Sequence, residues 1–159
     1  MSSRPFPWEM QYPPKVSWDL EIPRETLPGF LDHAVARFAD RTAIEFRGRK
    51  ITYAEFGDMV NAAAARLQQP GVGHVVSVAL YLPNTPWHPI SFFGVLKAGG
   101  RVVHLSPLDP PRVLAKKMAD SDARILIATN LPPLFASAMT LLTEGAAERL
   151  TIGRVRRIG

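Results

Sequence analysis

The chain has 159 residues, of which 47% are hydrophobic and 21% are charged, and its formal net charge is +5. These values are typical of one globular domain with a core of ordinary size, and they exclude an intrinsically disordered chain. The sequence contains no cysteine, which excludes disulfides and thiolate metal sites. The first ten residues, MSSRPFPWEM, lack the apolar stretch of a secretory signal, and no apolar run approaches the roughly 20 residues that span a bilayer. We therefore expect a cytoplasmic protein with no transmembrane segment.

Residues 1–28 hold six of the fifteen prolines. Because proline fixes φ and removes a backbone donor, these residues are predicted to form an extended arm, and residues 29–159 the folded domain. The arm also carries Trp8, Tyr12 and Trp18. Large apolar rings favour packing on a surface, which could belong to this chain, to further chain or to a second protomer.

A helix and a hairpin are predicted to follow the arm. Apolar positions share one helical face over residues 27–39. Residues 43–46 and 51–53 then flank a short loop that contains Gly48, which is typical of a β-hairpin.

A second amphipathic helix is predicted after the hairpin. Thr52 and Glu55 have the spacing of a capping box, in which the hydroxyl accepts from a free amide and the carboxylate reaches back. The pair Pro70-Gly71 is expected to end this helix.

From there strands and helices are predicted to alternate, which indicates an α/β fold with a mainly parallel sheet and flanking helices. The expected strands are residues 75–82, 101–105, 124–128 and 150–152. Each of the three intervening helices is preceded by a capping residue or a proline. These starts are Asn84-Thr85-Pro86, Asp109-Pro110-Pro111 and Thr129-Asn130 with Pro132.

The glycines Gly94, Gly99 and Gly100 do not have the arrangement of a phosphate-binding loop. In such a loop the glycines follow a strand and open a helix, whereas here they end a helix and precede a strand. Lys97 is expected in the last turn of that helix, where the helix dipole favours a cation. Nothing near it in the sequence would lower its pKa as a catalytic lysine requires.

The four histidines are interpreted as isolated from one another, and they show no metal-ligand spacing. They are His33, His74, His88 and His104. His104 alternates with apolar neighbours and is interpreted as a sheet residue, and Asp120 and Asp122 are interpreted as parts of a turn. No catalytic, cofactor-binding or metal-ligating residue is assigned.

Four arginines lie in the last eleven positions with no acidic residue among them. They are Arg149, Arg154, Arg156 and Arg157. A basic tail can bind nucleic acid or an anionic membrane, but no aromatic residues interleave with these arginines as a stacking surface requires. We therefore expect a solvated end, or one whose acidic partners lie in further chain, and no nucleic-acid partner.

Three segments in this order resemble the adenylate-forming enzymes. Residues 42–56, TAIEFRGRKITYAEF, resemble their first core motif, and residues 78–114, with LKAGG before a strand and a proline-rich loop, resemble the second. Residues 119–135 continue in the manner of acyl-CoA synthetases, and residues 12–46 resemble bacterial long-chain fatty acid–CoA ligases. The resemblance runs to about residue 152.

The resemblance implies the N-terminal subdomain of that fold and a family activity. Such enzymes use ATP and Mg²⁺ to convert a carboxylate to an acyl-adenylate, and then transfer the acyl group to coenzyme A. The family's phosphate loop, nucleotide and Mg²⁺ segments, acyl tunnel and C-terminal catalytic lysine would follow the region present here. No cofactor is therefore expected for this chain alone, and the fatty acid substrate is expected only in the complete enzyme.

Three functional hypotheses remain open at this point. The first is the N-terminal segment of a fatty acyl-CoA ligase, whose partner is the C-terminal remainder or a second protomer and which exposes an apolar sheet edge when alone. The second is a non-catalytic interaction module that pairs with a ligase. The third is a nucleic-acid or membrane contact through the arginine tail, which would weaken with salt.

Overall fold

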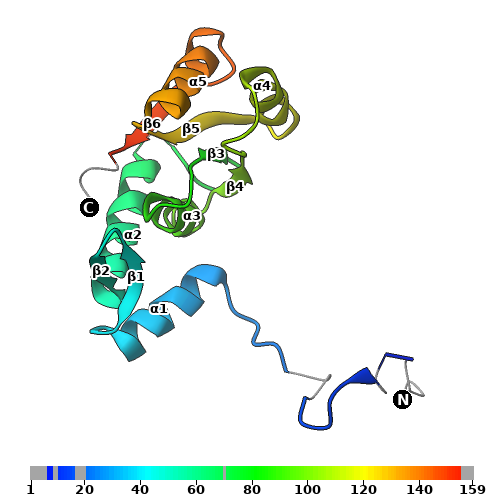
Figure 1. The fold of residues 1–159 in the computed structure, drawn as a ribbon, viewed down its shortest axis with the longest axis vertical. Helices are drawn as coiled ribbons and strands as arrows, with labels where there is room; N and C mark the ends of the chain where they lie inside the picture. Colours follow the sequence, from blue (N-terminus) through cyan, green and yellow to red (C-terminus); the bar gives the residue numbers. More distant parts are fainter. Residues whose placement is uncertain (1–6, 9–10, 17–20, 70, 155–159) are drawn as a thin grey trace.

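In the computed structural model, residues 7–8, 11–16, 21–69 and 71–154 are described. The arm extends away from the folded body (Figure 1), and its side chains Trp8 and Tyr12 are 52% and 44% exposed. Trp18 lies outside the described residues.

The first helix and the hairpin agree with the sequence pattern. Helix α1 (Leu27–Phe38) begins with the Thr26 hydroxyl accepting from the Gly29 amide. Strands β1 (Thr42–Phe46) and β2 (Arg49–Thr52) pair antiparallel. The turn between them places Gly48 at φ +79°, in the left-handed region that glycine adopts readily.

The predicted capping box is present at the start of α2 (Tyr53–Gln68). The Glu55 amide donates to the Thr52 hydroxyl at 3.2 Å, and the Thr52 amide donates to the Glu55 carboxylate at 2.8 Å. Both exchanges satisfy amides that the first turn leaves without a helical partner. The buried face of α2 and the side chains of α1 and β2 enclose a small core of their own around Ile51, Phe56 and Val60.

The remaining strands form a parallel sheet in the order β4-β3-β5-β6. They are β3 (Ser77–Tyr81), β4 (Arg101–His104), β5 (Ala123–Thr129) and β6 (Arg149–Gly153). The predicted strand at residues 75–82 is too long at its start. Val75 lies at φ +67° and is 68% exposed, so the extended backbone begins only after it.

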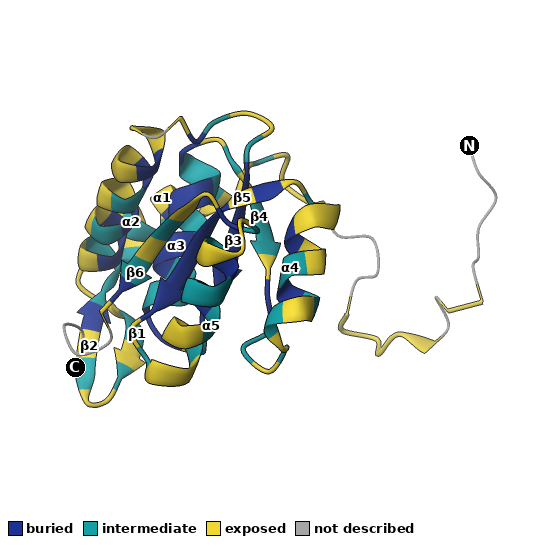
Figure 2. Ribbon diagram, turned by 90° about the horizontal axis from the view of Figure 1, so that it is seen from above, coloured by how far each residue is buried: buried dark blue, intermediate teal, exposed yellow. Residues whose placement is uncertain are grey.

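Helices cover both faces of this sheet (Figures 1 and 2). They are α2, α3 (Trp87–Lys97), α4 (Pro111–Asp120) and α5 (Pro132–Thr143). Alternate residues of β3 face opposite layers because side chains alternate along a strand. Val78 and Leu80 pack with α2 and α3, whereas Ala79 and Tyr81 pack with α4 and α5.

The helix starts that follow the sheet strands differ from the prediction. The N-cap positions of α3, α4 and α5 are Pro86, Pro110 and Leu131, and none makes a side-chain cap bond. The Asp109 carboxylate instead accepts a hydrogen bond from the Lys117 ammonium, eight residues further along the chain. Proline still accounts for the starts of α4 and α5, where it stands in the first turn, because its fixed φ suits that turn and its missing amide needs no partner.

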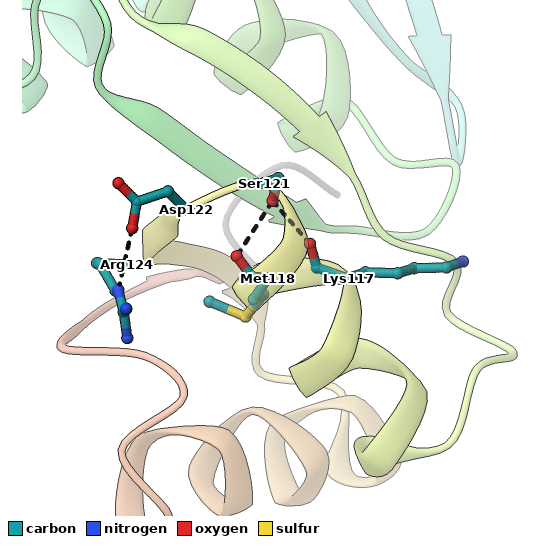
Figure 3. Close-up of polar contacts among 5 residues, drawn as sticks. All are labelled: Lys117, Met118, Ser121, Asp122 and Arg124. Carbon is teal, nitrogen blue, oxygen red and sulfur yellow. Dashed lines mark hydrogen bonds and ion pairs between the residues drawn. The ribbon is translucent and has the colours of Figure 1, made fainter.

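The turn from α4 to β5 is held by local contacts (Figure 3). The Ser121 hydroxyl donates to the Lys117 and Met118 carbonyls at 2.7 and 3.2 Å, which satisfies the end of the helix. Asp122 adopts φ +49° and pairs with Arg124 at 3.4 Å. Asp120 was predicted in this turn, but it is the last residue of α4.

Candidate functional site

The carboxyl ends of the four parallel strands lie along one edge of the sheet. In open α/β sheets this edge binds ligands, especially where neighbouring strands send their connections to opposite faces. Here that position is between β3 and β5, because the chain continues from β3 into α3 and from β5 into α5 on the other face. We therefore treat this edge as the candidate site.

Two histidines that are far apart in the sequence meet at this edge. His88 is the second residue of α3, and His104 is the last residue of β4. The His88 Nε2 and His104 Nδ1 atoms are 3.3 Å apart, and the ring centres are 5.2 Å apart. The interpretation of the histidines as separate residues is wrong for this pair. The predicted parallel sheet could have indicated this proximity. The helix that follows one parallel strand begins at the same edge of the sheet at which the neighbouring strand ends.

Burial distinguishes the two imidazoles. The pKa of His88 is lowered from its ordinary value of 6.5, first because burial disfavours the charged ring and second because His104 lies beside it. His104 is exposed. Phe92 lies nearly parallel to the His104 ring, with their centres 5.8 Å apart.

Three buried polar atoms have no hydrogen-bond partner among the described residues. They are Ser77 Oγ, Thr85 Oγ1 and Trp87 Nε1. Thr85 and Trp87 follow the carboxyl end of β3, whereas Ser77 lies at its other end. The Trp87 indole packs directly on the backbone of Gly153 at the end of β6, where a Cβ would lie 2.8 Å from the ring. Trp87 and Gly153 both line a groove on this side of the sheet.

The groove lies between helices α2 and α3 and the face of β5 and β6 that is turned toward these helices. Its volume is about 310 Å³, and its lining includes Met59, Ile90, Ile127 and Thr151. Arg149, the first residue of β6, also lines it, so one of the four tail arginines belongs to the fold. Arg156 and Arg157 lie outside the described residues. A groove lined mainly by apolar side chains offers packing surface for another segment.

The structure assigns a structural role to the candidate glycines. Gly99 ends α3 at φ +89°, and a Cβ on Gly100 would lie 2.8 Å from the Val72 side chain. A Cβ on Gly94 would lie 2.8 Å from Ala63 of α2. These glycines permit turns and close packing, and they do not open a helix, so they do not fit a cradle for nucleotide phosphates.

The other candidate residues pair locally or on the surface. Lys97 donates to Asp32 of α1 at 2.5 Å, a contact that joins residues far apart in the chain. His33 lies 3.1 Å from Glu25. Within the described ranges, no group of three or more histidine, aspartate and glutamate side chains could hold a metal ion. None of the helices in those ranges is both long and apolar enough to cross a membrane.

Comparison with known proteins identifies the family. The AMP-binding enzyme family matches residues 31–154, and the chain belongs to that family. The chain is 35% identical over 150 residues to a long-chain fatty acid–CoA ligase of Bacillus subtilis, and 35% identical over 125 residues to one of Salmonella typhimurium. These matches cover 94% and 77% of the chain but 26% and 22% of the relatives, so the chain spans about a quarter of their length.

Solved structures agree on the fold. The N-terminal subdomain of Klebsiella oxytoca NpsA, solved in complex with 3-hydroxyanthranilyl-AMSN, matches with a TM-score of 0.61 and 32% identity over 64% of this chain and 26% of that chain. A benzoate CoA ligase from Burkholderia xenovorans matches with a TM-score of 0.72 over 79% of this chain and 25% of that chain, at 24% identity. The predicted partial N-terminal subdomain of the adenylate-forming fold is confirmed.

Proposed function

We propose that this chain is the N-terminal part of a long-chain fatty acid–CoA ligase. Such an enzyme activates a fatty acid with ATP and Mg²⁺ to an acyl-adenylate and then forms the thioester with coenzyme A. The observation that carries the proposal is the 35% identity to the Bacillus subtilis ligase over nearly the whole chain. The match to the AMP-binding enzyme family supports the use of ATP.

In this proposal the chain supplies scaffold and not the reacting groups. The glycines do not fit a phosphate cradle, and the groove beside β6 is lined mainly by apolar side chains. Within the described sheet, β4 and β6 each pair with one strand, which leaves one side of each strand available for further chain. We expect the remainder of the ligase to pack against the β6 side, with a second protomer as the other possible partner.

The proposal also covers the domain boundaries of the chain and the cellular location of the ligase. We assign residues 1–28 to an arm and residues 29–159 to a partial α/β domain. We assign the ligase to the cytoplasm. Catalytic, nucleotide-binding and Mg²⁺-binding residues are assigned to the remainder of the enzyme.

The test is an assay of the longest native form of the protein, identified by its intact mass and by the reading frame beyond Gly159. We expect this form to release AMP from ATP in the presence of palmitate and coenzyme A, and the 159-residue chain alone to release none. Benzoate and an amino acid serve as competing substrates. A preference for either of them, or a native protein of 17.6 kDa, would overturn the proposal.

A further inference from the structure

We propose that His88 and His104 bind a divalent transition-metal ion of the zinc type at the carboxyl edge of the sheet. This site is independent of the proposed ligase chemistry, because none of its groups takes part in adenylation or thioester formation in the scheme above. It rests on the relative placement of two side chains from α3 and β4.

The distances between the rings fit a shared metal ion. Two imidazoles on one tetrahedral zinc ion, each with a Zn–N bond of about 2.05 Å, have their ligating nitrogens about 3.3 Å apart and their ring centres about 5.2 Å apart. The observed separations are 3.3 Å between His88 Nε2 and His104 Nδ1 and 5.2 Å between the ring centres. A straight N–H···N bond of the same length would place the centres about 5.6 Å apart. With the ring planes 22° apart, the pair makes a bent hydrogen bond whose two separations equal those of two imidazoles on one ion.

Neighbouring aromatic rings hold the His104 imidazole in this arrangement. Phe92 lies one helical turn after His88 on α3, and its ring lies nearly parallel to the His104 ring at an interplanar angle of 19°. Phe93 meets the Phe92 ring edge-on, with centres 5.2 Å apart. Side chains that are fixed by neighbours lose less conformational entropy when they bind an ion.

The site is expected to be open. Two imidazoles leave positions of a tetrahedral ion for water, because the described residues contain no third histidine, aspartate or glutamate that joins this pair in a metal-binding group. His104 is exposed, which provides a route for the ion to enter. Imidazole ligands favour Zn²⁺, Ni²⁺ and Cu²⁺, whereas Mg²⁺ and Ca²⁺ prefer oxygen. Without metal the pair shares one N–H···N proton, which must move to the outer nitrogen of its ring when the ion binds.

The test is isothermal titration of the untagged full chain with ZnCl₂ at neutral pH. We expect one Zn²⁺ per chain, and a dissociation constant at least about tenfold weaker in His88→Ala and in His104→Ala. The two remaining histidines supply matched controls, so His33→Ala and His74→Ala should bind as the wild type does. Excess Mg²⁺ should not compete.

A second measurement separates loss of binding from loss of folding. Zn²⁺ should raise the melting temperature of the wild-type chain, because an ion that binds only the folded state stabilises it. The conservative variants His88→Gln and His104→Gln should melt like the metal-free wild type and show no rise. The proposal is overturned if Zn²⁺ does not bind the wild type, if either variant binds Zn²⁺ as tightly as the wild type, or if the control variants lose binding equally.

Discussion

Replacement of Gly94 by alanine tests the closest approach between α2 and α3. The added Cβ would lie 2.8 Å from the Ala63 Cβ, which is 0.6 Å less than the 3.4 Å at which ordinary contact begins. The Ala63 methyl is attached directly to the α2 backbone and cannot turn away. The two helices must therefore separate to admit the new methyl group.

Two opposing terms set the size of the effect. Overpacking of this kind costs about 1–3 kcal/mol, whereas alanine is favoured over glycine inside a helix by about 1 kcal/mol. Because the contact is far below the ordinary range and its partner is rigid, we expect the clash to cost about 2–3 kcal/mol, which exceeds the helix-propensity gain. The free energy of unfolding should fall by about 1–2 kcal/mol in Gly94→Ala.

The compensating change is Ala63→Gly, which removes the methyl group that the new Cβ meets. Alone it should cost about 1 kcal/mol, because glycine weakens the helix. In the double variant the clash is absent and the two helix-propensity terms cancel, so its stability should return to within about 1 kcal/mol of the wild type. Gly73→Ala is the control, because a Cβ there meets nothing within 4 Å.

The assay is urea unfolding of the four proteins and the control, followed by circular dichroism. The double-variant cycle should give a favourable coupling of about 2–3 kcal/mol between the two positions, because the two single losses sum to that amount and the double variant shows neither. The reasoning is refuted if Gly94→Ala is as stable as the wild type, or if the effects of the two substitutions simply add.

Three further predictions concern local structure, the core and pH. Thr52→Ala should lower the free energy of unfolding by about 1 kcal/mol in the same assay, because the amide of Glu55 loses its acceptor; an unchanged midpoint would contradict the capping box. Leu126→Ala in the fully buried centre of β5 should cost about 3 kcal/mol, and a loss below 1 kcal/mol, as on a surface, would argue against this core. With a chelator present, stability should fall as pH drops through 6.5 toward the lowered pKa of His88, because the unfolded chain binds more protons there. His88→Gln should flatten that part of the stability profile measured by thermal melting from pH 7.5 to 5.5, and an equal slope in both proteins would show that His88 does not cause it.

Much of the fold could be predicted from local pattern. The capping box, the hairpin turn at Gly48 and the alternation of strands and helices all depend on residues that are close in sequence, and all appear in the structure. The error in the predicted start of β3 also has a local cause. Val75 lies outside the strand predicted for it because its backbone takes a left-handed conformation, which a β-branched residue adopts rarely and which hydrophobicity does not indicate.

The candidate site could be predicted only in part. The carboxyl edge follows from the parallel βαβ pattern, but the meeting of His88 and His104 depends on β4 lying next to β3. Similarly, the structural role of Gly94 depends on which helix crosses α3 and at what distance. Local sequence does not specify such distances, because they result from the packing of whole elements.

The sequence alone determined the element types, the α/β class and the resemblance to adenylate-forming enzymes, because periodicity, turn residues and motif order are properties of neighbouring positions. The tertiary structure was needed to establish the strand order β4-β3-β5-β6, the pairing of Lys97 with Asp32 and the approach of the two imidazoles. These features join segments that are distant in the chain. Their free energy comes from burying one element against another, which no single segment encodes.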